Sequence, residues 1–248
     1  MDNRLLDVSQ LTGGYGSNRQ VIHDISFHVR ERELVGLIGM NGAGKSTTIK
    51  HILGLMQPVS GTITLKGRTL QEDTTAFRSQ IAYIPETPRL YEELTLYEHL
   101  ELTAMAYHLD EATFKTRADE LLNEFKMSKM VKWFPSTFSK GMQQKVMVMC
   151  AFLVRPALLI VDEPFVGLDP LATHSLLNLF SELKEAGTGI LMSTHILPTA
   201  EKYGDHFVLL HGGRAVLKGT LADMQAQAKR PQASLEDLFM LVAKDRLP

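Results

Sequence analysis

The sequence has a single cysteine among its 248 residues, Cys150, so no disulfide can form within the chain. Cysteine-rich zinc sites are excluded for the same reason, and the nine histidines show no H-E-x-x-H spacing. The G-x-S-x-G nucleophile elbow is also missing. Cys150 itself falls in an apolar pattern at helical spacing, which predicts a core residue rather than a redox or metal site.

Long apolar runs and an excess of one charge are missing too. No stretch approaches the ~18–20 apolar residues that cross a bilayer, and the start, Met1-Asp2-Asn3-Arg4, lacks the basic-then-apolar layout of a signal peptide. The 26 Lys and Arg against 28 Asp and Glu give a net charge of −2, which argues against nucleic acid as a partner. We therefore expect a cytoplasmic protein that meets a membrane only through a partner.

One glycine-rich stretch, from Gly39 to Thr47, matches the phosphate-binding pattern G-x-x-x-x-G-K-[ST]. An apolar run at 34–38 precedes it and apolar residues at helical spacing follow it, which predicts a strand, a loop and a helix. In such a turn, backbone N–H groups and the positive end of a helix surround a polyphosphate. Lys45 would reach the β- and γ-phosphates, and Ser46 would hold Mg²⁺. The expected nucleotide-binding residues here are Gly39, Asn41, Gly42, Ala43, Gly44, Lys45, Ser46 and Thr47.

The order of the predicted elements indicates an α/β fold with a largely parallel sheet. Period-2 patterns predict strands within 4–30, and a mainly helical block spans 86–155. After it, buried strands at 158–161 and 190–193 alternate with a helix at 169–186, and strands near 206–210 and 214–217 precede two helices. We expect one domain over 1–248, with a core at 1–85 and 157–220, a helical subdomain at 86–156 and C-terminal helices at 221–248.

Three features should meet at the carboxyl edge of this sheet, where ligands bind in such folds. They are the loop at 39–47, the pair Asp162-Glu163 and the lone His195. Each also has an ordinary interpretation: the loop as a plain glycine-rich loop, the two carboxylates as a helix cap and a surface group, and His195 as a structural histidine. Together they predict phosphoryl transfer, in which Asp162 holds Mg²⁺ directly or through water. Glu163 would polarise the attacking water, and His195 would orient that water and touch the γ-phosphate.

With these motifs in this order, the chain resembles the ATP-binding cassette (ABC) family of ATPases along essentially its whole length. The stretch 39–47 corresponds to the Walker A loop, 158–163 to Walker B with its catalytic Glu163, Gly167-Leu168-Asp169 to the D-loop, and His195 to the switch histidine. Tyr15, which alone reads as a loop tyrosine, corresponds to the aromatic residue that stacks on adenine. The resemblance implies a P-loop NTPase (RecA-like) core, an N-terminal antiparallel β subdomain and a helical insertion, with Lys45, Glu163 and His195 catalytic.

The chain departs from the family pattern in two motifs. The signature, usually Leu-Ser-Gly-Gly-Gln, keeps Ser139 and Gly141 but carries Phe138, Lys140 and Met142. This variant is similar to that of exporter-type subunits. The second departure is Glu86, which replaces a glutamine that senses the γ-phosphate and Mg²⁺. A carboxylate can still ligate Mg²⁺, but it cannot donate a hydrogen bond when ionised. Both a tolerated substitution and an altered coupling between ATP and a membrane partner stay open.

The resemblance also implies how the chain works. It implies a Mg²⁺-dependent ATPase that forms a head-to-tail dimer, with each ATP between one Walker A loop and Ser139 and Gly141 of a second copy. It further implies an exporter with a separate membrane-spanning subunit, on the inner face of the cell membrane. Segments 83–98 and 138–145 resemble exporter ATPases of the bacterial Ecs type, and Leu90 to Glu93 is the candidate contact with that subunit, or else a solvated acidic turn.

Two other functions are compatible with a P-loop. A soluble single-cassette ATPase could drive assembly rather than transport. A P-loop kinase is the other, but the signature at 138–144 and His195 argue against it.

Overall fold

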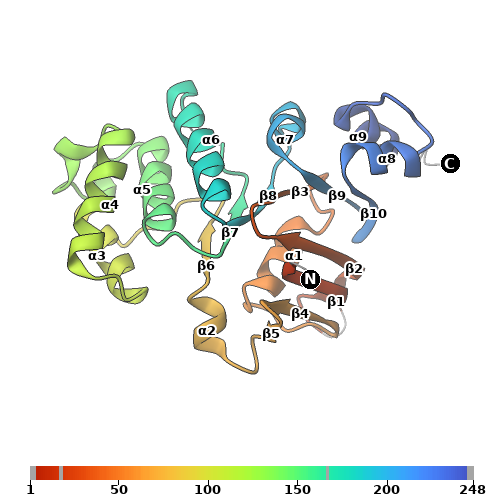
Figure 1. Cartoon of the computed structure of the whole chain (residues 1–248), viewed down its shortest axis with the longest axis horizontal. Coiled ribbons are helices and arrows are strands. Elements are labelled where there is room, and N and C mark those ends of the chain that lie inside the picture. The colour runs from red at the N-terminus through yellow and green to blue at the C-terminus, as the bar shows by residue number, and fades with distance from the viewer. Residues whose placement is uncertain (1–3, 17–18, 166–167, 245–248) are drawn as a thin grey trace.

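The computed structural model describes residues 4–16, 19–165 and 168–244 of the chain. Its elements include two sheets and a series of helices (Figure 1). The strands are β1 Arg4–Gly14, β2 Gln20–Arg30, β3 Leu34–Gly39, β4 Ser60–Leu65, β5 Arg68–Thr69, β6 Ile81–Ile84, β7 Leu158–Asp162, β8 Gly189–Ser193, β9 His206–His211 and β10 Arg214–Gly219. The α-helices are α1 Lys45–Ile52, α2 Thr74–Arg78, α3 Leu96–Ala106, α4 Glu111–Glu124, α5 Lys140–Leu153, α6 Pro170–Glu185, α7 Leu197–Tyr203, α8 Leu221–Gln227 and α9 Leu235–Ala243.

A six-stranded sheet in the order β10-β9-β3-β8-β7-β6 forms the centre of the molecule. All of its pairings are parallel except that of β10 with β9. β3, β7 and β8 are buried along their whole length, as their continuous apolar sequences predict for strands covered on both faces. This confirms the predicted α/β fold with a largely parallel sheet.

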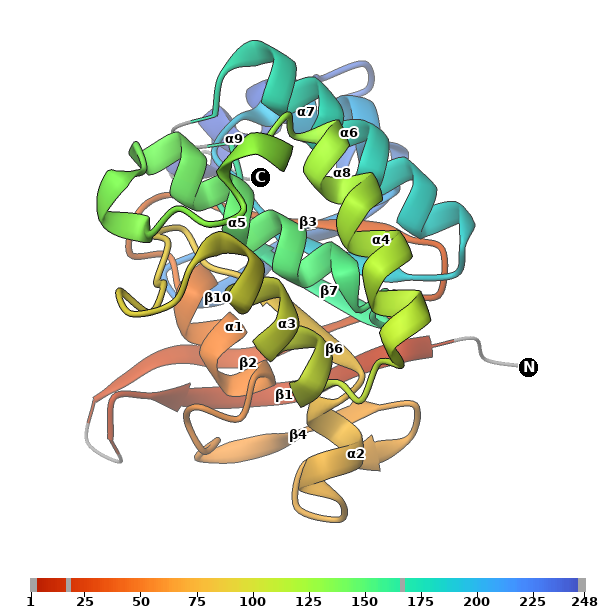
Figure 2. The ribbon, with the colours of Figure 1, turned by 90° about the vertical axis from the view of Figure 1, so that its left-hand side faces the viewer.

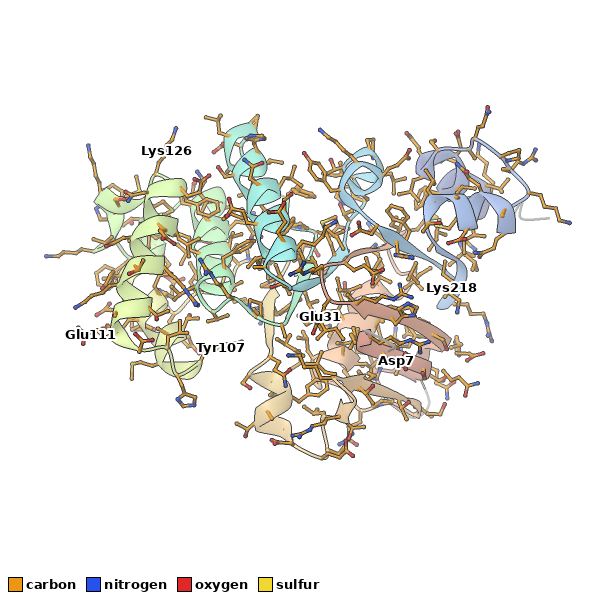
Figure 3. The ribbon with its side chains drawn as sticks, viewed as in Figure 1. Asp7, Glu31, Tyr107, Glu111, Lys126 and Lys218 are labelled. Carbon is orange, nitrogen blue, oxygen red and sulfur yellow. The ribbon has the colours of Figure 1, made fainter. Side chains whose placement is uncertain are left out.

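The N-terminal strands form a separate antiparallel sheet in the order β2-β1-β4-β5. In Figure 1 this sheet and α1 lie below the six-stranded sheet, and α6 to α9 lie above it. Apolar residues of β1 and β2 share a core cluster with α1 and with one face of β3. The side chain of Lys218 on β10 reaches β2, where its Nζ donates to the Ser26 carbonyl oxygen at 3.0 Å (Figure 3). The antiparallel sheet predicted for the N-terminal segment is therefore present.

Helices α3, α4 and α5 pack together at one end of the molecule (Figure 2). α3 begins with a capping box, in which the side chains of Thr95 and Glu98 pair with each other's backbone N–H. Ser139 caps α5 by accepting a hydrogen bond from the Met142 backbone N–H at 3.3 Å. Cys150 packs against this core, and burial raises the pKa of its thiol to about 11. The thiol is therefore protonated at neutral pH, as expected of a core cysteine.

Three short elements were not predicted from the sequence. They are β5, α2 and α7, of two, five and seven residues. Elements this short carry too few residues for a periodic pattern. α7 matters for the site, because it begins directly after the segment that contains His195. Among the described residues, no helix has the length and apolar character needed to cross a bilayer.

Candidate nucleotide-binding site

A cavity of ≈ 700 Å³ opens at the carboxyl ends of the parallel strands. Most of the site residues predicted from the sequence line it, although they come from five separate parts of the chain. These residues are Tyr15, Gly39, Asn41, Gly42, Gly44, Lys45, Ser46, Thr47, Glu86, Asp162, Glu163 and His195. The sheet order explains the gathering, because β6, β7, β8 and β3 are neighbours whose carboxyl ends lie side by side.

The phosphate loop leaves β3 at Gly39 and enters α1 at Lys45. Gly42 and Gly44 have φ angles of 82° and 109°, a left-handed region that favours glycine. A Cβ atom on Gly44 would also lie 2.7 Å from the Ile22 side chain. The Lys45 ammonium is nearly buried and donates to the Gly39 carbonyl oxygen at 2.8 Å. The lysine thus points back over the loop, where a polyphosphate would lie. Ala43 is buried and does not line the cavity.

Asp162 ends β7 and is only 5% exposed. It pairs with Ser193 across β7 and β8, and the Ser193 hydroxyl donates to its Oδ1. The buried Asp162 carboxylate, the Ser46 hydroxyl and the Glu86 carboxylate line the same cavity and offer it only oxygen donors. Mg²⁺ prefers such hard oxygen ligands and usually keeps waters and substrate phosphates in its shell. These residues therefore fit the predicted Mg²⁺.

Glu163 follows Asp162 and turns its carboxylate towards His195. Its Oε2 lies 2.7 Å from His195 Nδ1 and accepts the His195 backbone N–H at 3.1 Å. The Glu163 backbone N–H donates to the Ser193 carbonyl oxygen at 3.1 Å, and the residue has a φ of 49°, which is uncommon for a residue with a side chain. Such a strained conformation persists only where the surroundings fix it. The structure thus brings the proposed base and the switch histidine into direct contact.

The pKa of Tyr83 reflects burial and negative charge at this edge of the sheet. Tyr83 lies on β6, three residues before Glu86. Burial, followed by the charges of Asp162 and Glu86, raises the pKa of the Tyr83 phenol to about 12. The phenol is therefore neutral at pH 7 and adds no charge to this edge of the sheet.

Tyr15 follows β1 and lines the same cavity. Its side chain is 59% exposed, which is unusual for a large aromatic residue. The Lys50 ammonium lies 5.3 Å from the ring centre, and a hydrogen bond with the Thr47 side chain is the main cause of the lowered pKa of the phenol. The ring is thus held beside the phosphate loop with one face available to a ligand.

The signature residues are placed apart from this cavity. Ser139 and Gly141 lie at the start of α5, and neither lines the cavity within the same chain. Lys145 of α5 pairs with Asp169, whose carboxylate caps α6. Gly167, predicted in the D-loop, lies outside the described residues.

Four residues of the site were not identified from the sequence. Val21, Met40 and Phe239 line the cavity, and Ser193 holds Asp162. Met40 lies inside the loop motif, and Ser193 ends a predicted strand beside the one that carries Asp162, so both could have been found. Val21 and Phe239 carry no motif, and only the fold brings them to the site.

Comparison with known proteins agrees with this geometry. The family model described as ABC transporter matches residues 22–166. The chain is 56% identical, over 97% of its own length and 97% of the relative, to the ABC-type transporter ATP-binding protein EcsA of Bacillus subtilis. A solved structure described as the ATP binding subunit of an ABC transporter superposes with a TM-score of 0.94, at 55% identity, over 96% of this chain and 99% of that one. The chain therefore belongs to the ABC transporter family, as an ATP-binding subunit.

A more distant relative is the Nod factor export ATP-binding protein I of Cupriavidus pinatubonensis. It is 30% identical over 89% of this chain and 67% of the relative. A cassette dimer bound to ADP and Pi, MJ0796, superposes with a TM-score of 0.78 at 23% identity, over 87% of this chain and 98% of that one, and this likeness concerns the fold alone.

Proposed function

We propose that this protein is the Mg²⁺-dependent ATPase subunit of a membrane exporter. The observation that supports this most strongly is the single cavity that unites the phosphate loop, Asp162, Glu163 and His195. Backbone N–H groups of the loop and the start of α1 bind the phosphates, with Lys45 on the β- and γ-phosphates. Tyr15 stacks on the adenine. Ser46, Asp162 and Glu86 would hold Mg²⁺, and the ion would supply positive charge against the charge that develops on the phosphates.

The Glu163–His195 pair carries out the proton chemistry in this proposal. Glu163 accepts a proton from the attacking water, since its carboxylate is fixed at the end of β7. His195 keeps that carboxylate in place through two contacts with one oxygen, one from the ring and one from the backbone. The histidine ring is largely exposed at 63%, so it can also reach the γ-phosphate and the water.

The hydrolytic site is completed by a second copy of the chain. Ser139 and Gly141 begin α5, and the N-terminus of a helix with a hydroxyl cap attracts phosphate. Because both residues lie away from the cavity of their own chain, they can act in such a site only across a head-to-tail dimer. ATP then joins the two copies, and hydrolysis releases them.

Export through a separate membrane-spanning subunit is supported by the relatives and by the surface. One relative is named for export, and the similar EcsA is named as a transporter ATP-binding protein. Between β6 and α3, Tyr91 is 62% exposed, while its backbone N–H donates to His99 Nε2 at 2.9 Å. An exposed aromatic residue on a fixed backbone suits a docking contact. We therefore infer that Leu90 to Glu93 contact the membrane subunit, at the inner face of the cell membrane.

Co-purification from the native organism tests the transport function. We expect the tagged full-length chain to bring down a multi-spanning membrane protein and to hydrolyse ATP only with Mg²⁺ present. Tyr91→Ala should weaken that capture, while Trp133→Ala, which also removes an exposed aromatic side chain, serves as the control. Capture of a purely soluble complex would contradict transport and favour an ATPase that drives assembly.

Glu86 offers a separate test of coupling. Glu86→Gln restores the family's usual residue and replaces a carboxylate that lines the cavity with a hydrogen-bond donor. If Glu86 alters coupling, this change should shift ATP turnover severalfold in the complex with the membrane subunit. Transport by the same complex is measured in parallel. Unchanged turnover and unchanged transport would mean that Glu86 is only a tolerated replacement.

A further inference from the structure

The nucleotide cavity includes one residue from the far end of the chain. Phe239 lies on α9, the last helix, yet it lines the same cavity as Lys45, Ser46 and Glu163. Its side chain is partly buried and packs against a core cluster that contains Ile38, the residue before Gly39. The ring therefore touches both the support of the phosphate loop and the space where a nucleotide would lie.

α9 is firmly anchored beside the site. A capping box of Ser234 and Asp237 starts the helix, and the buried Leu235 and Leu238 fix one side of it. The Leu235 backbone N–H also donates to Glu201 Oε2, on α7, at 2.7 Å. Because α7 follows His195 directly, α9 is tied to the segment that carries this histidine as well as to the sheet.

α9 also approaches the cavity from a different side than the phosphate-loop helix. Its core cluster includes Ile38 and Leu209, whereas α1 packs with Leu37 in the other cluster. Successive side chains of a strand point to opposite faces, so α1 and α9 cover opposite faces of β3. Figure 1 agrees, with α9 above the six-stranded sheet and α1 below it.

We propose that Phe239 is a positioning residue of the nucleotide site. Its ring lines the cavity on the face opposite α1. There it packs against the end of β3 that leads into the loop, and it excludes water from that side of the bound nucleotide. This inference rests on the proposed ATP binding and adds the last helix to that site.

Removal of the ring tests the inference. Phe239→Ala should weaken ATP binding by about 3- to 10-fold, the size expected for loss of one aromatic packing contact. Phe239→Tyr should restore wild-type affinity, because it keeps the ring. Met240→Ala is the matched control, since this neighbour is 43% exposed and does not line the cavity. Titration calorimetry with ATP measures the affinity of the full-length chain, and thermal melts with and without ATP measure its stabilisation by nucleotide.

A purely structural role gives a different result. In that case Phe239→Ala would melt at a lower temperature without nucleotide but would bind ATP as tightly as the wild type, which would overturn the inference. Should Phe239→Ala fail to fold, Phe239→Leu keeps apolar volume without the ring, and wild-type affinity in that variant would equally overturn it. A wild-type chain that binds no ATP would instead refute the proposed function itself.

Discussion

Glu163→Gln should all but abolish ATP hydrolysis while ATP binding survives. An amide has the shape of the carboxylate and can still accept hydrogen bonds from His195, but it cannot take a proton from water. Loss of a general base lowers turnover by about 10²- to 10⁴-fold. Phosphate release and ATP titration on the same protein measure the two properties separately.

The matched control is Glu185→Gln, which neutralises an exposed carboxylate at the end of α6 and should hydrolyse ATP as the wild type does. If Glu163→Gln hydrolyses ATP at the normal rate, Glu163 is not the base. Loss of ATP binding in Glu163→Gln would also contradict the assignment, because it would make the carboxylate a binding group.

Ser139→Arg should lower hydrolysis by about 10²-fold without changing the ATP affinity of the isolated chain. The residue caps α5 and does not line the cavity of its own chain. Only in a dimer would the bulky side chain enter the site and displace a phosphate-binding helix N-terminus, and removal of one such donor group typically costs this much. ATP titration and phosphate release on the purified protein separate the two effects.

Loss of the cap must be distinguished from loss of the dimer site. Ser139→Ala removes the cap hydroxyl without adding bulk, which destabilises a helix by ~1 kcal/mol, and thermal melts of the isolated chain measure that contribution. Ser79→Arg introduces the same bulk at another exposed helix-terminal serine and should leave hydrolysis unchanged. Weakened ATP binding by Ser139→Arg in the isolated chain would mean that Ser139 acts within its own subunit.

Most of the fold could be predicted because its central strands are continuous apolar runs. The runs at 158–161 and 190–193 are too short for a typical buried helix, which favours buried strands, and a glycine-rich loop between a strand and a helix has few alternatives. α7 was missed because a seven-residue helix gives no clear apolar period. The pairing of Ser193 with Asp162 was missed because the local sequence does not determine the order of strands in a sheet.

The residues of the site differ in the same respect: some can be predicted from the sequence and others cannot. Lys45, Asp162 and Glu163 lie in motifs whose chemistry is fixed by neighbours in the sequence. Phe239 reaches the cavity only through the packing of α9 on β9 and α7, which no local pattern encodes. Contacts between distant elements depend on the whole core, so such a residue is found only from the folded chain.

The composite site is the central claim, and the mass of the Glu163→Gln protein in solution tests it most directly. Light scattering after gel filtration should give the 27.7 kDa of one chain without nucleotide, and twice that mass with ATP and Mg²⁺, because bound ATP that is not hydrolysed holds the two copies together. A mass of one chain at every ATP concentration, from a protein whose wild type hydrolyses ATP at the same dilution, would contradict it.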